Sequence, residues 1–197
     1  MTLIVRNLQL VRDRITTACV SAGRQPGSVR LLVVSKKFGV DAVLQAVSDG
    51  QRVFGENYIA EGVEKITATR AMLPAGVTLE WHCIGPVQSN KTRLVAEHFD
   101  WVQSIDRLKI AERLAEQRPA DLPPLQICIQ VNIDGGASKS GVAPEDALAL
   151  ALAISKLPRL QLRGLMAIPE PAPDFIAACA LHTRARSEER RVGKECA

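Results

Sequence analysis

Short apolar runs alternate along most of the chain with segments in which apolar side chains recur every three or four residues. The runs are rich in Val, Ile and Leu, and polar or Gly- and Pro-containing stretches separate them, as is typical of buried strands. We predict strands over residues 30–35, 52–54, 79–84, 101–104, 125–132 and 160–168. The segments with helical spacing predict helices over residues 3–22, 41–49, 58–70, 90–99, 106–119 and 144–156.

Residues that start or stop helices support several of these boundaries. Gly23 and Gly50 follow the first two helical patterns, where glycine commonly ends a helix. Asp106 is the predicted N-cap of the helix that Pro119 ends, and Pro144 opens the next one. The chain is therefore expected to repeat a strand–helix unit.

This alternation is the signature of a parallel α/β sheet, which forms either an open doubly wound sheet or a barrel. An open sheet usually carries G-x-G-x-x-G after its first strand, whereas Ser-Lys-Lys-Phe-Gly stands at residues 35–39. A complete (β/α)-barrel has eight units in about 250 residues. The pattern over 197 residues predicts an incomplete TIM-like barrel of about six of eight βα units.

The last residues differ from the rest of the chain. Residues 184–197 have no apolar period and no strand pattern. We predict a barrel domain over residues 1–183 and a non-native or disordered tail over residues 184–197. A natural charged terminus is the alternative.

Composition and charge exclude several function classes. The chain is 47% hydrophobic and 23% charged, which is ordinary for a globular protein, and no apolar run approaches the roughly 20 residues that span a bilayer. Its net charge is +4, of which residues 184–197 supply +2 (five basic and three acidic side chains). No basic stripe with interleaved aromatic residues remains, so we expect no nucleic-acid partner and no membrane partner. The start of the chain lacks a signal-peptide pattern, and we expect a cytoplasmic protein.

The cysteines and histidines do not have metal-ligand spacing. There are five cysteines, without a C-x-x-C pair, and three histidines. Cys83 and Cys128 lie inside predicted strands, where a thiol acts as a small core residue. We expect reduced thiols and no structural metal.

Lys36 is the residue whose position most favours chemistry, because it follows the first predicted strand directly. Functional side chains of parallel sheets gather at the carboxyl ends of the strands. Burial beside the run 31–34, with Lys37 adjacent, would favour the neutral amine, which attacks aldehydes to form Schiff bases. The alternative is that Lys36 pairs with Glu56 or binds an anion.

Five ordered motifs raise the case for this chemistry. They are Leu-Leu-Val-Val-Ser-Lys ending at residue 36, Phe-Gly-Glu-Asn-Tyr ending at 58, Glu-Trp-His-Cys-Ile-Gly-Pro-Val-Gln-Ser-Asn-Lys ending at 91, Ser-Lys-Ser-Gly ending at 141 and Arg-Gly-Leu-Met ending at 166. Together they closely resemble the pyridoxal phosphate homeostasis proteins, from the first helix to about Pro173.

The resemblance implies a barrel like the N-terminal domain of alanine racemase that holds pyridoxal 5′-phosphate. Lys36 matches the family's Schiff-base lysine, and Asn57 matches a residue near the cofactor. His82 and Met166 match strand-end positions that line the pocket; His82 is equally open to a role in the core. Lys139 matches a position that we expect to bind cofactor secondarily, in a loop over residues 134–141 that either cradles a phosphate or is a flexible turn.

The same resemblance implies a role in intracellular vitamin B6 homeostasis without established catalysis. The first alternative is a racemase-like enzyme that depends on pyridoxal phosphate, although Tyr58 is the only tyrosine and lies at a helix start. The second is an aldolase-like barrel that uses Lys36 without a cofactor.

The chain departs from the family pattern where barrels commonly bind phosphate. The family's Ser/Gly-rich phosphate loop, and the arginine expected to face the pyridine nitrogen, belong to the loops after strands seven and eight, and neither is found in the sequence. The full-length family is expected to be monomeric. For this chain we predict weak cofactor binding and aggregation through open strand edges.

Overall fold

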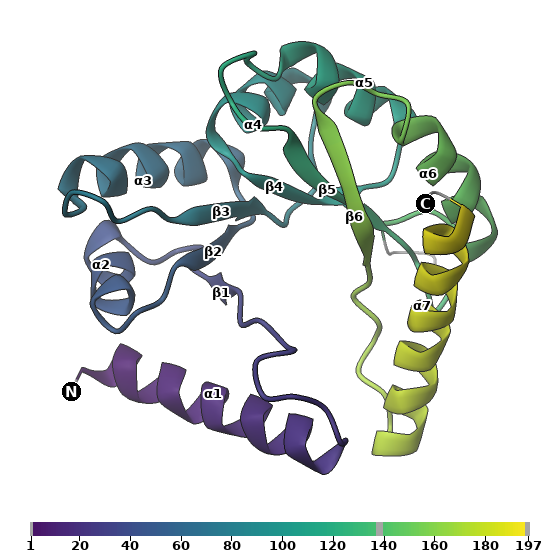
Figure 1. The fold of residues 1–197 in the computed structure, drawn as a ribbon, viewed down its shortest axis with the longest axis horizontal. Helices are drawn as coiled ribbons and strands as arrows, with labels where there is room; N and C mark the ends of the chain where they lie inside the picture. Colours follow the sequence, from purple (N-terminus) through teal and green to yellow (C-terminus); the bar gives the residue numbers. More distant parts are fainter. Residues whose placement is uncertain (1, 137–139, 196–197) are drawn as a thin grey trace. The chain divides into compact units, whose positions relative to one another are not determined.

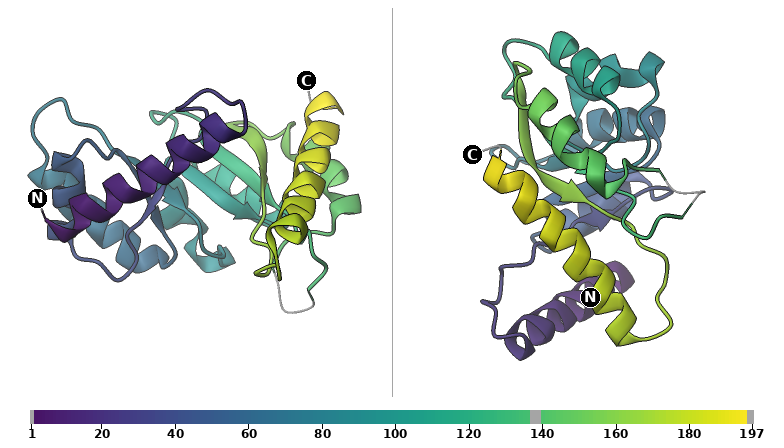
Figure 2. Two further views of the ribbon diagram at one scale, coloured as in Figure 1. Left: turned by 90° about the horizontal axis from the view of Figure 1, so that it is seen from below. Right: turned by 90° about the vertical axis from the view of Figure 1, so that its right-hand side faces the viewer.

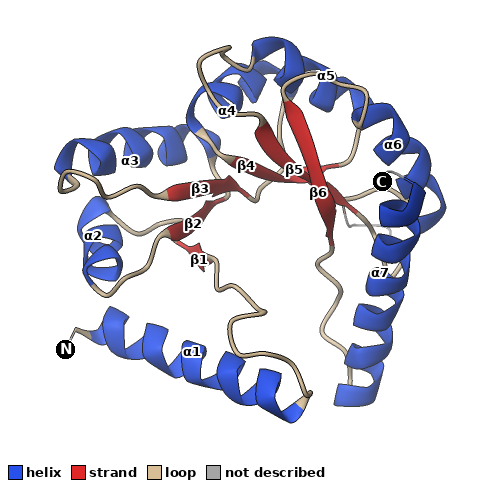
Figure 3. Cartoon of the chain, viewed as in Figure 1, coloured by secondary structure: helices blue, strands red, loops and turns tan. Residues whose placement is uncertain are grey.

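The computed structural model describes residues 2–136 and 140–195. The chain divides into two compact units, Met1–Trp81 and His82–Ala197. Within the described residues, six strands alternate with helices, and strand order follows chain order (Figures 1 and 3). The predicted alternation of strands and helices is therefore confirmed. A complete barrel of this kind has eight strands.

The unit Met1–Trp81 contains three helices around short strands. Its helices are α1 (Leu3–Ser21), α2 (Val40–Ser48) and α3 (Ile59–Met72), and its strands are β1 (Val33–Val34), β2 (Val53–Glu56) and the first half of β3 (Glu80–Cys83). β1 pairs with β2 in parallel, Val33 opposite Phe54 and Val34 opposite Gly55. The ring of Phe54 packs on that of Trp81, with centroids 5.3 Å apart, and both side chains are fully buried.

The unit His82–Ala197 begins with the second half of β3 and contains the longer strands. Its elements are η1 (Ser89–Lys91), α4 (Thr92–His98), β4 (Trp101–Ile105), α5 (Leu108–Gln117), β5 (Leu125–Gln130), η2 (Pro144–Asp146), α6 (Ala147–Ile154), β6 (Leu160–Met166) and α7 (Phe175–Glu195). The pairings β3–β4, β4–β5 and β5–β6 are parallel.

Alternation along β5 separates an apolar face from a more polar one. Leu125, Ile127 and Ile129 are buried, whereas Gln126, Cys128 and Gln130 between them are half-buried. Successive side chains of a strand point to opposite faces, so the first set forms the core beneath the helices. α5 places four buried apolar side chains in that core (Ile110, Ala111, Leu114 and Ala115). Cys83 is in the core as predicted, but Cys128 lies on the polar face and is only half-buried.

Two predicted boundaries are wrong for local reasons. The first strand was predicted over residues 30–35, but β1 comprises only Val33–Val34, and the turn after Ser35 limits it on the C-terminal side. The helix predicted to begin at the N-cap Asp106 begins at Leu108 after the N-cap Arg107, and no side chain caps it. The carboxylate of Asp106 instead contacts the guanidinium of Arg107, with Oδ1 and Nε 3.0 Å apart.

The segment predicted as a non-native or disordered tail is helical as far as the structure describes it. α7 continues to Glu195 and lies beside α6 (Figure 2). Val192 is buried, and Arg191 donates to Glu188 one turn earlier, with Nη2 and Oε2 2.7 Å apart. Arg and Glu are good helix formers and pair well at this spacing, which accounts for a helix without an apolar period. The described part of this segment is therefore helical, and its non-native or disordered character stays a prediction.

The described residues contain neither a membrane-spanning helix nor a cluster of metal-binding side chains. None of their helices is long and apolar enough to cross a membrane. Over residues 2–136 and 140–195, no group of three or more His, Cys, Asp or Glu side chains could hold a metal ion.

Candidate functional site

Lys36 lies in a tight turn directly after β1. The amide of Phe38 donates to the carbonyl of Ser35 at 3.0 Å, which closes a four-residue turn with Lys36 and Lys37 at its centre. Lys37 has φ of 65°, in the left-handed region that glycine usually occupies at this position of a type II turn. For a residue with a side chain, that conformation costs roughly 1–2 kcal/mol. Other contacts must therefore hold this turn.

Lys36 and Asn57 follow two neighbouring parallel strands, β1 and β2. Val34 is opposite Gly55, and the amide of Ser35 donates to the carbonyl of Gly55 at 3.0 Å, so the parallel pairing continues past β1. Beyond that hydrogen bond β1 gives way to the turn with Lys36, and β2 ends at Glu56, directly before Asn57. Lys36 is exposed and Asn57 is half-buried. Both predicted site residues of this unit thus lie just after the carboxyl ends of paired strands, and their role stays a prediction.

Lys36 itself is not buried, which corrects the expectation of a desolvated amine. β1 has only two residues, and Val34 beside the turn is 39% exposed, so the described residues of this unit do not enclose Lys36 in apolar side chains. The buried lysine of this unit is Lys65 of α3, whose side chain is 5% exposed. Sequence analysis missed it because Lys65 lies in the middle of a helix, where most lysines face solvent. Its spacing of four from Glu61 was the available signal.

Glu56 pairs with Lys65, so the alternative in which Lys36 pairs with Glu56 is wrong. Nζ of Lys65 lies 2.7 Å from Oε1 of Glu56, and the Glu56 side chain is fully buried. The hydroxyl of Ser35 donates to the same oxygen at 2.6 Å.

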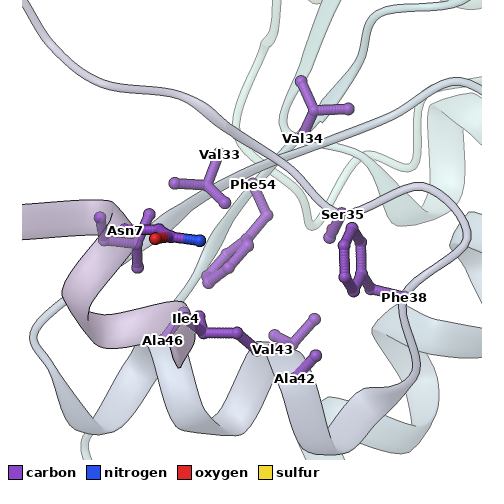
Figure 4. Close-up of a pocket in the computed structure, with 11 residues that line it drawn as sticks. Ile4, Asn7, Val33, Val34, Ser35, Phe38, Ala42, Val43, Ala46 and Phe54 are labelled. Carbon is purple, nitrogen blue, oxygen red and sulfur yellow. The ribbon is translucent and has the colours of Figure 1, made fainter. Parts of the chain in front are cut away.

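An apolar cavity lies on the same side of the unit as Ser35, between α1, α2 and the turn (Figure 4). Its volume is about 180 Å³. Among the residues that line it, only Asn7 and Ser35 have polar side chains, and neither is charged. Figure 4 shows the ring of Phe54, the ring of Phe38 and the side chain of Ile4 around it. This cavity adjoins the turn but offers no acid, base or cation.

In the second unit, His82 is fixed in a row of planar groups. Its ring stacks on that of Trp101, with centroids 5.0 Å apart and an interplanar angle of 15°. The side-chain amide of Gln103 donates to Nδ1 of His82 at 2.9 Å, which leaves the proton of a neutral ring on Nε2. The guanidinium of Arg163 lies over the Trp101 ring, with its Cζ 5.7 Å from the ring centroid. His82 is 4% exposed.

Met166 and His82 share a face but lie in different layers of the strands. His82 is in register with Trp101 and through it with Gln126, whereas Met166 is in register with Gln130. Four residues of β5 separate the two rows, which is about 13 Å along the strand. The geometry therefore places half-buried Met166 at the carboxyl end of β6 and His82 deeper in the unit.

Burial makes thiolate chemistry unfavourable at the two strand cysteines. Burial raises the pKa of Cys83 to about 12, against a small lowering by the carbonyl of Gly85, which accepts from its Sγ at 3.8 Å. Burial also raises the pKa of Cys128 to about 11, with Arg163 opposing and Glu189 adding to the effect. Both groups are therefore neutral thiols at physiological pH.

In the loop after β5, predicted either to cradle a phosphate or to be a flexible turn, the amides of Gly135 and Gly136 donate to nearby side chains. Gly135 donates to Oδ1 of Asn132 at 3.1 Å, and Gly136 donates to Oδ1 of Asp134 at 3.5 Å. Lys139 lies outside the described residues. Gly141 has φ of 120°, and an added Cβ would lie 2.8 Å from the amide nitrogen of Asn132. The close approach at Gly141 gives this position a structural role.

The chain is similar to proteins of known family and structure. Residues 7–188 match the family model described as alanine racemase, N-terminal domain. The pyridoxal phosphate homeostasis protein of Vibrio cholerae is 52% identical over 192 residues, which are 98% of this chain and 81% of that protein. The protein of the same name from Pseudomonas aeruginosa is 56% identical over 186 residues, 94% of this chain and 79% of its own.

One solved structure of a similar protein contains bound pyridoxal phosphate (PLP). PipY of Synechococcus elongatus, determined with PLP bound, is 34% identical to this chain and superposes with a TM-score of 0.77. The match covers 92% of this chain and 83% of PipY.

Proposed function

Since the chain belongs to the alanine racemase N-terminal domain family and, within it, to the pyridoxal phosphate homeostasis proteins, we propose that it binds pyridoxal 5′-phosphate through Lys36. The observation that supports this most strongly is that Lys36 and Asn57 both follow the carboxyl ends of β1 and β2, which pair in parallel. PipY, a homologue with PLP bound, supports the choice of cofactor.

The residues around the turn fit such a cofactor. When bound, its aldehyde condenses with an amine, releases water and leaves a Schiff base. The exposed turn makes the amine of Lys36 accessible, and the amide of half-buried Asn57 can donate or accept a hydrogen bond beside it. For Met166, at the carboxyl end of β6, and His82, a stacked ring in the same unit, a role in cofactor binding is proposed from the family resemblance alone.

Storage and delivery of the cofactor, without turnover, is the role that we propose. A racemase needs an acid and a base on opposite sides of its substrate. Tyr58, the only tyrosine in the sequence, is 53% exposed as the N-cap of α3, one residue after Asn57. The curated relatives are named for homeostasis. Incubation with L-alanine tests the alternative, since a racemase would convert it to the D form.

A cytoplasmic location belongs to the same proposal. Cys19, Cys83, Cys128 and Cys179 are free thiols in the structure. Unpaired cysteines are typical of reducing compartments. Fractionation of the producing organism, with antibodies to this chain, would test the assignment.

The site is tested by locating the covalent bond. The full chain would be incubated with pyridoxal phosphate, reduced with borohydride, digested and examined by mass spectrometry. We expect the mass addition on Lys36, and its loss from that peptide in Lys36→Ala. Lys109→Ala is the matched control, because Lys109 is an exposed lysine of α5. No addition at Lys36 in the wild-type chain would overturn the proposal.

Weak binding and aggregation are also proposed for this chain. β1 and β6 are at the ends of the strand order, so each has backbone groups along one edge without a strand partner. Light scattering at rising concentration would detect the association. A monomer that retains one equivalent of pyridoxal phosphate through gel filtration would contradict both expectations.

A further inference from the structure

Lys65 uses all three of its ammonium protons inside the unit Met1–Trp81. Its Nζ donates to the carbonyl of Ser35 at 2.7 Å, to Oε1 of Glu56 at 2.7 Å and to Oε1 of Glu61 at 3.1 Å. An ammonium group has three donors, so this side chain is fully satisfied. Lys65 therefore joins two carboxylates from different elements, β2 and α3.

The two carboxylates hold the residues on either side of Lys36. Oε1 of Glu56 accepts from the hydroxyl of Ser35 at 2.6 Å. Oε1 of Glu61 accepts from the backbone amide of Lys37 at 2.9 Å. We call Glu56, Glu61 and Lys65 the clamp. Lys36 is thus flanked on both sides by residues that the clamp binds.

The clamp holds the strained backbone of the turn in place. Lys37 has a positive φ, and a strained backbone persists only where its surroundings fix it. The Lys37 amide lowers the pKa of Glu61, with Lys65 adding to the effect, which agrees with a charged carboxylate at this contact. The turn is therefore fixed by charge-assisted hydrogen bonds at Ser35 and Lys37.

A gain in stability does not by itself explain a buried ion pair such as Glu56–Lys65. Apolar replacements of such pairs are often as stable as the pair itself. In addition, Oε2 of Glu56 is buried without a hydrogen-bond partner in the described structure, which is costly for a carboxylate. These charged groups therefore serve to hold Ser35 and Lys37 in position rather than to stabilise the fold.

We propose that Lys65, through Glu56 and Glu61, is a positioning residue that fixes the turn bearing Lys36 and so sets the rate at which Lys36 captures an aldehyde. This inference rests on the proposed function, because it assigns the capture to Lys36. It adds a role for three residues that do not themselves contact the aldehyde.

The first test breaks the outer arm of the clamp, whose loss leaves the core intact. Glu61 has a side chain that is 39% exposed, so Glu61→Ala should fold. Glu64→Ala is the matched control, an exposed glutamate of the same helix. The rate of capture would be followed with pyridoxal phosphate by absorbance and confirmed by borohydride reduction and peptide mapping. We expect Glu61→Ala to slow capture at Lys36 about fivefold, the equivalent of one hydrogen bond.

A second measurement follows the turn without any cofactor. Hydrogen exchange of the Lys37 amide, which donates to Glu61, should be faster in Glu61→Ala than in Glu64→Ala. Glu61→Gln retains an acceptor oxygen and should restore part of the protection and part of the capture rate. A purely structural role for Glu61 would change the unfolding midpoint but would not give this graded rescue.

The third variant tests Lys65 directly. Lys65→Met removes the charge at similar length, and Lys65→Arg retains it. We expect slower capture and a changed pH profile of capture in Lys65→Met, with partial rescue in Lys65→Arg. Should Lys65→Met fail to fold, the Glu61 variants decide the matter alone.

The outcomes separate the two proposals. If wild-type protein is modified at Lys36 and Glu61→Ala equals Glu64→Ala in capture and exchange, the clamp proposal is overturned and the function stands. If the wild type is not modified at Lys36, the function fails, and the positioning role fails with it. Faster exchange at Lys37 together with slower capture supports both.

Discussion

The pairings β1–β2 and β5–β6 show two ways of fixing a parallel strand. β5 and β6 are joined over six register pairs, from Leu125–Leu160 to Gln130–Met166, and β5 buries alternate apolar side chains. β1 and β2 share two such pairs. Beyond β1 the buried side chains of Ser35, Glu56 and Lys65 continue the connection.

The difference in the length of the two pairings shows where the chain can form a turn that presents a functional side chain. A long ladder fixes every residue in it through backbone hydrogen bonds, and it leaves no residue free to form a turn. At β1 the ladder ends early, so the turn can present Lys36 while side-chain contacts hold its neighbours Ser35 and Lys37. The comparison predicts that charge changes damage the first region and that cavity-forming changes damage the second.

The largest effect is expected from removing the buried carboxylate of the clamp. Glu56→Ala leaves the ammonium of Lys65 buried without its strongest partner, and breaking such a pair costs about 3–5 kcal/mol. Urea denaturation would measure the loss in the free energy of unfolding. Glu64→Ala, on the exposed side of α3, should change it by less than about 0.5 kcal/mol. Equal effects of the two variants would remove the contrast between the regions.

A somewhat smaller loss is expected in the β5–β6 region. Ile127→Ala creates a cavity at a fully buried position and should cost about 3 kcal/mol. Gln126→Ala, one residue away on the polar face of β5, should cost much less. Neither variant should alter capture of pyridoxal phosphate at Lys36 once the protein is folded. A slower capture in Ile127→Ala would show that the core of this region also governs the turn.

Acid should loosen the first region before the second. The hydrogen bond from Lys37 and the charge of Lys65 hold the pKa of Glu61 below 4.5. A lowered folded-state pKa means that the contribution of Glu61 is present above about pH 4.5 and is lost as the pH falls through the folded value. Hydrogen exchange between pH 6 and pH 3, corrected for intrinsic rates, should show falling protection at Lys37 and little change over Leu125–Gln130. Glu61→Gln, which cannot ionise, should abolish the pH dependence at Lys37.

The sequence was sufficient for the fold and for the family. Alternating apolar runs predicted each of the six strands within a few residues, because buried parallel strands have a strong compositional signal. The ordered motifs identified the family correctly, as the relatives from Vibrio cholerae and Pseudomonas aeruginosa establish.

The clamp could not be predicted from the sequence alone. Lys65 and Glu56 are nine residues apart, and their contact depends on which face of β2 is turned towards α3. Likewise, the exposure of Lys36 depends on how early β1 ends, and a run of apolar residues over 31–34 gave no sign of the turn. The helical form of residues 184–195 could not be predicted from apolar periodicity, because charged pairs and helix propensity form this part of α7.

The smallest predicted effect is a gain in stability in the first region that leaves the turn unchanged. Ala42 of α2 lines the apolar cavity of Figure 4, whose volume of about 180 Å³ exceeds the roughly 150 Å³ that accommodates a benzene-sized guest. Ala42→Leu places three further carbon atoms in that space. Because the site is half-buried, only part of the transfer free energy is gained, and we expect about 1 kcal/mol.

The control for this variant is Gln45→Leu, on the same helix but outside the cavity lining, which should change the free energy of unfolding by less than about 0.5 kcal/mol. Capture at Lys36 should be the same in both variants, since neither touches Glu56, Glu61 or Lys65. Stabilisation with unchanged capture would show that the apolar packing of this unit and the clamp act independently. A stabilised variant with altered capture would instead mean that the cavity side of the turn, through Phe38, helps to set the position of Lys36.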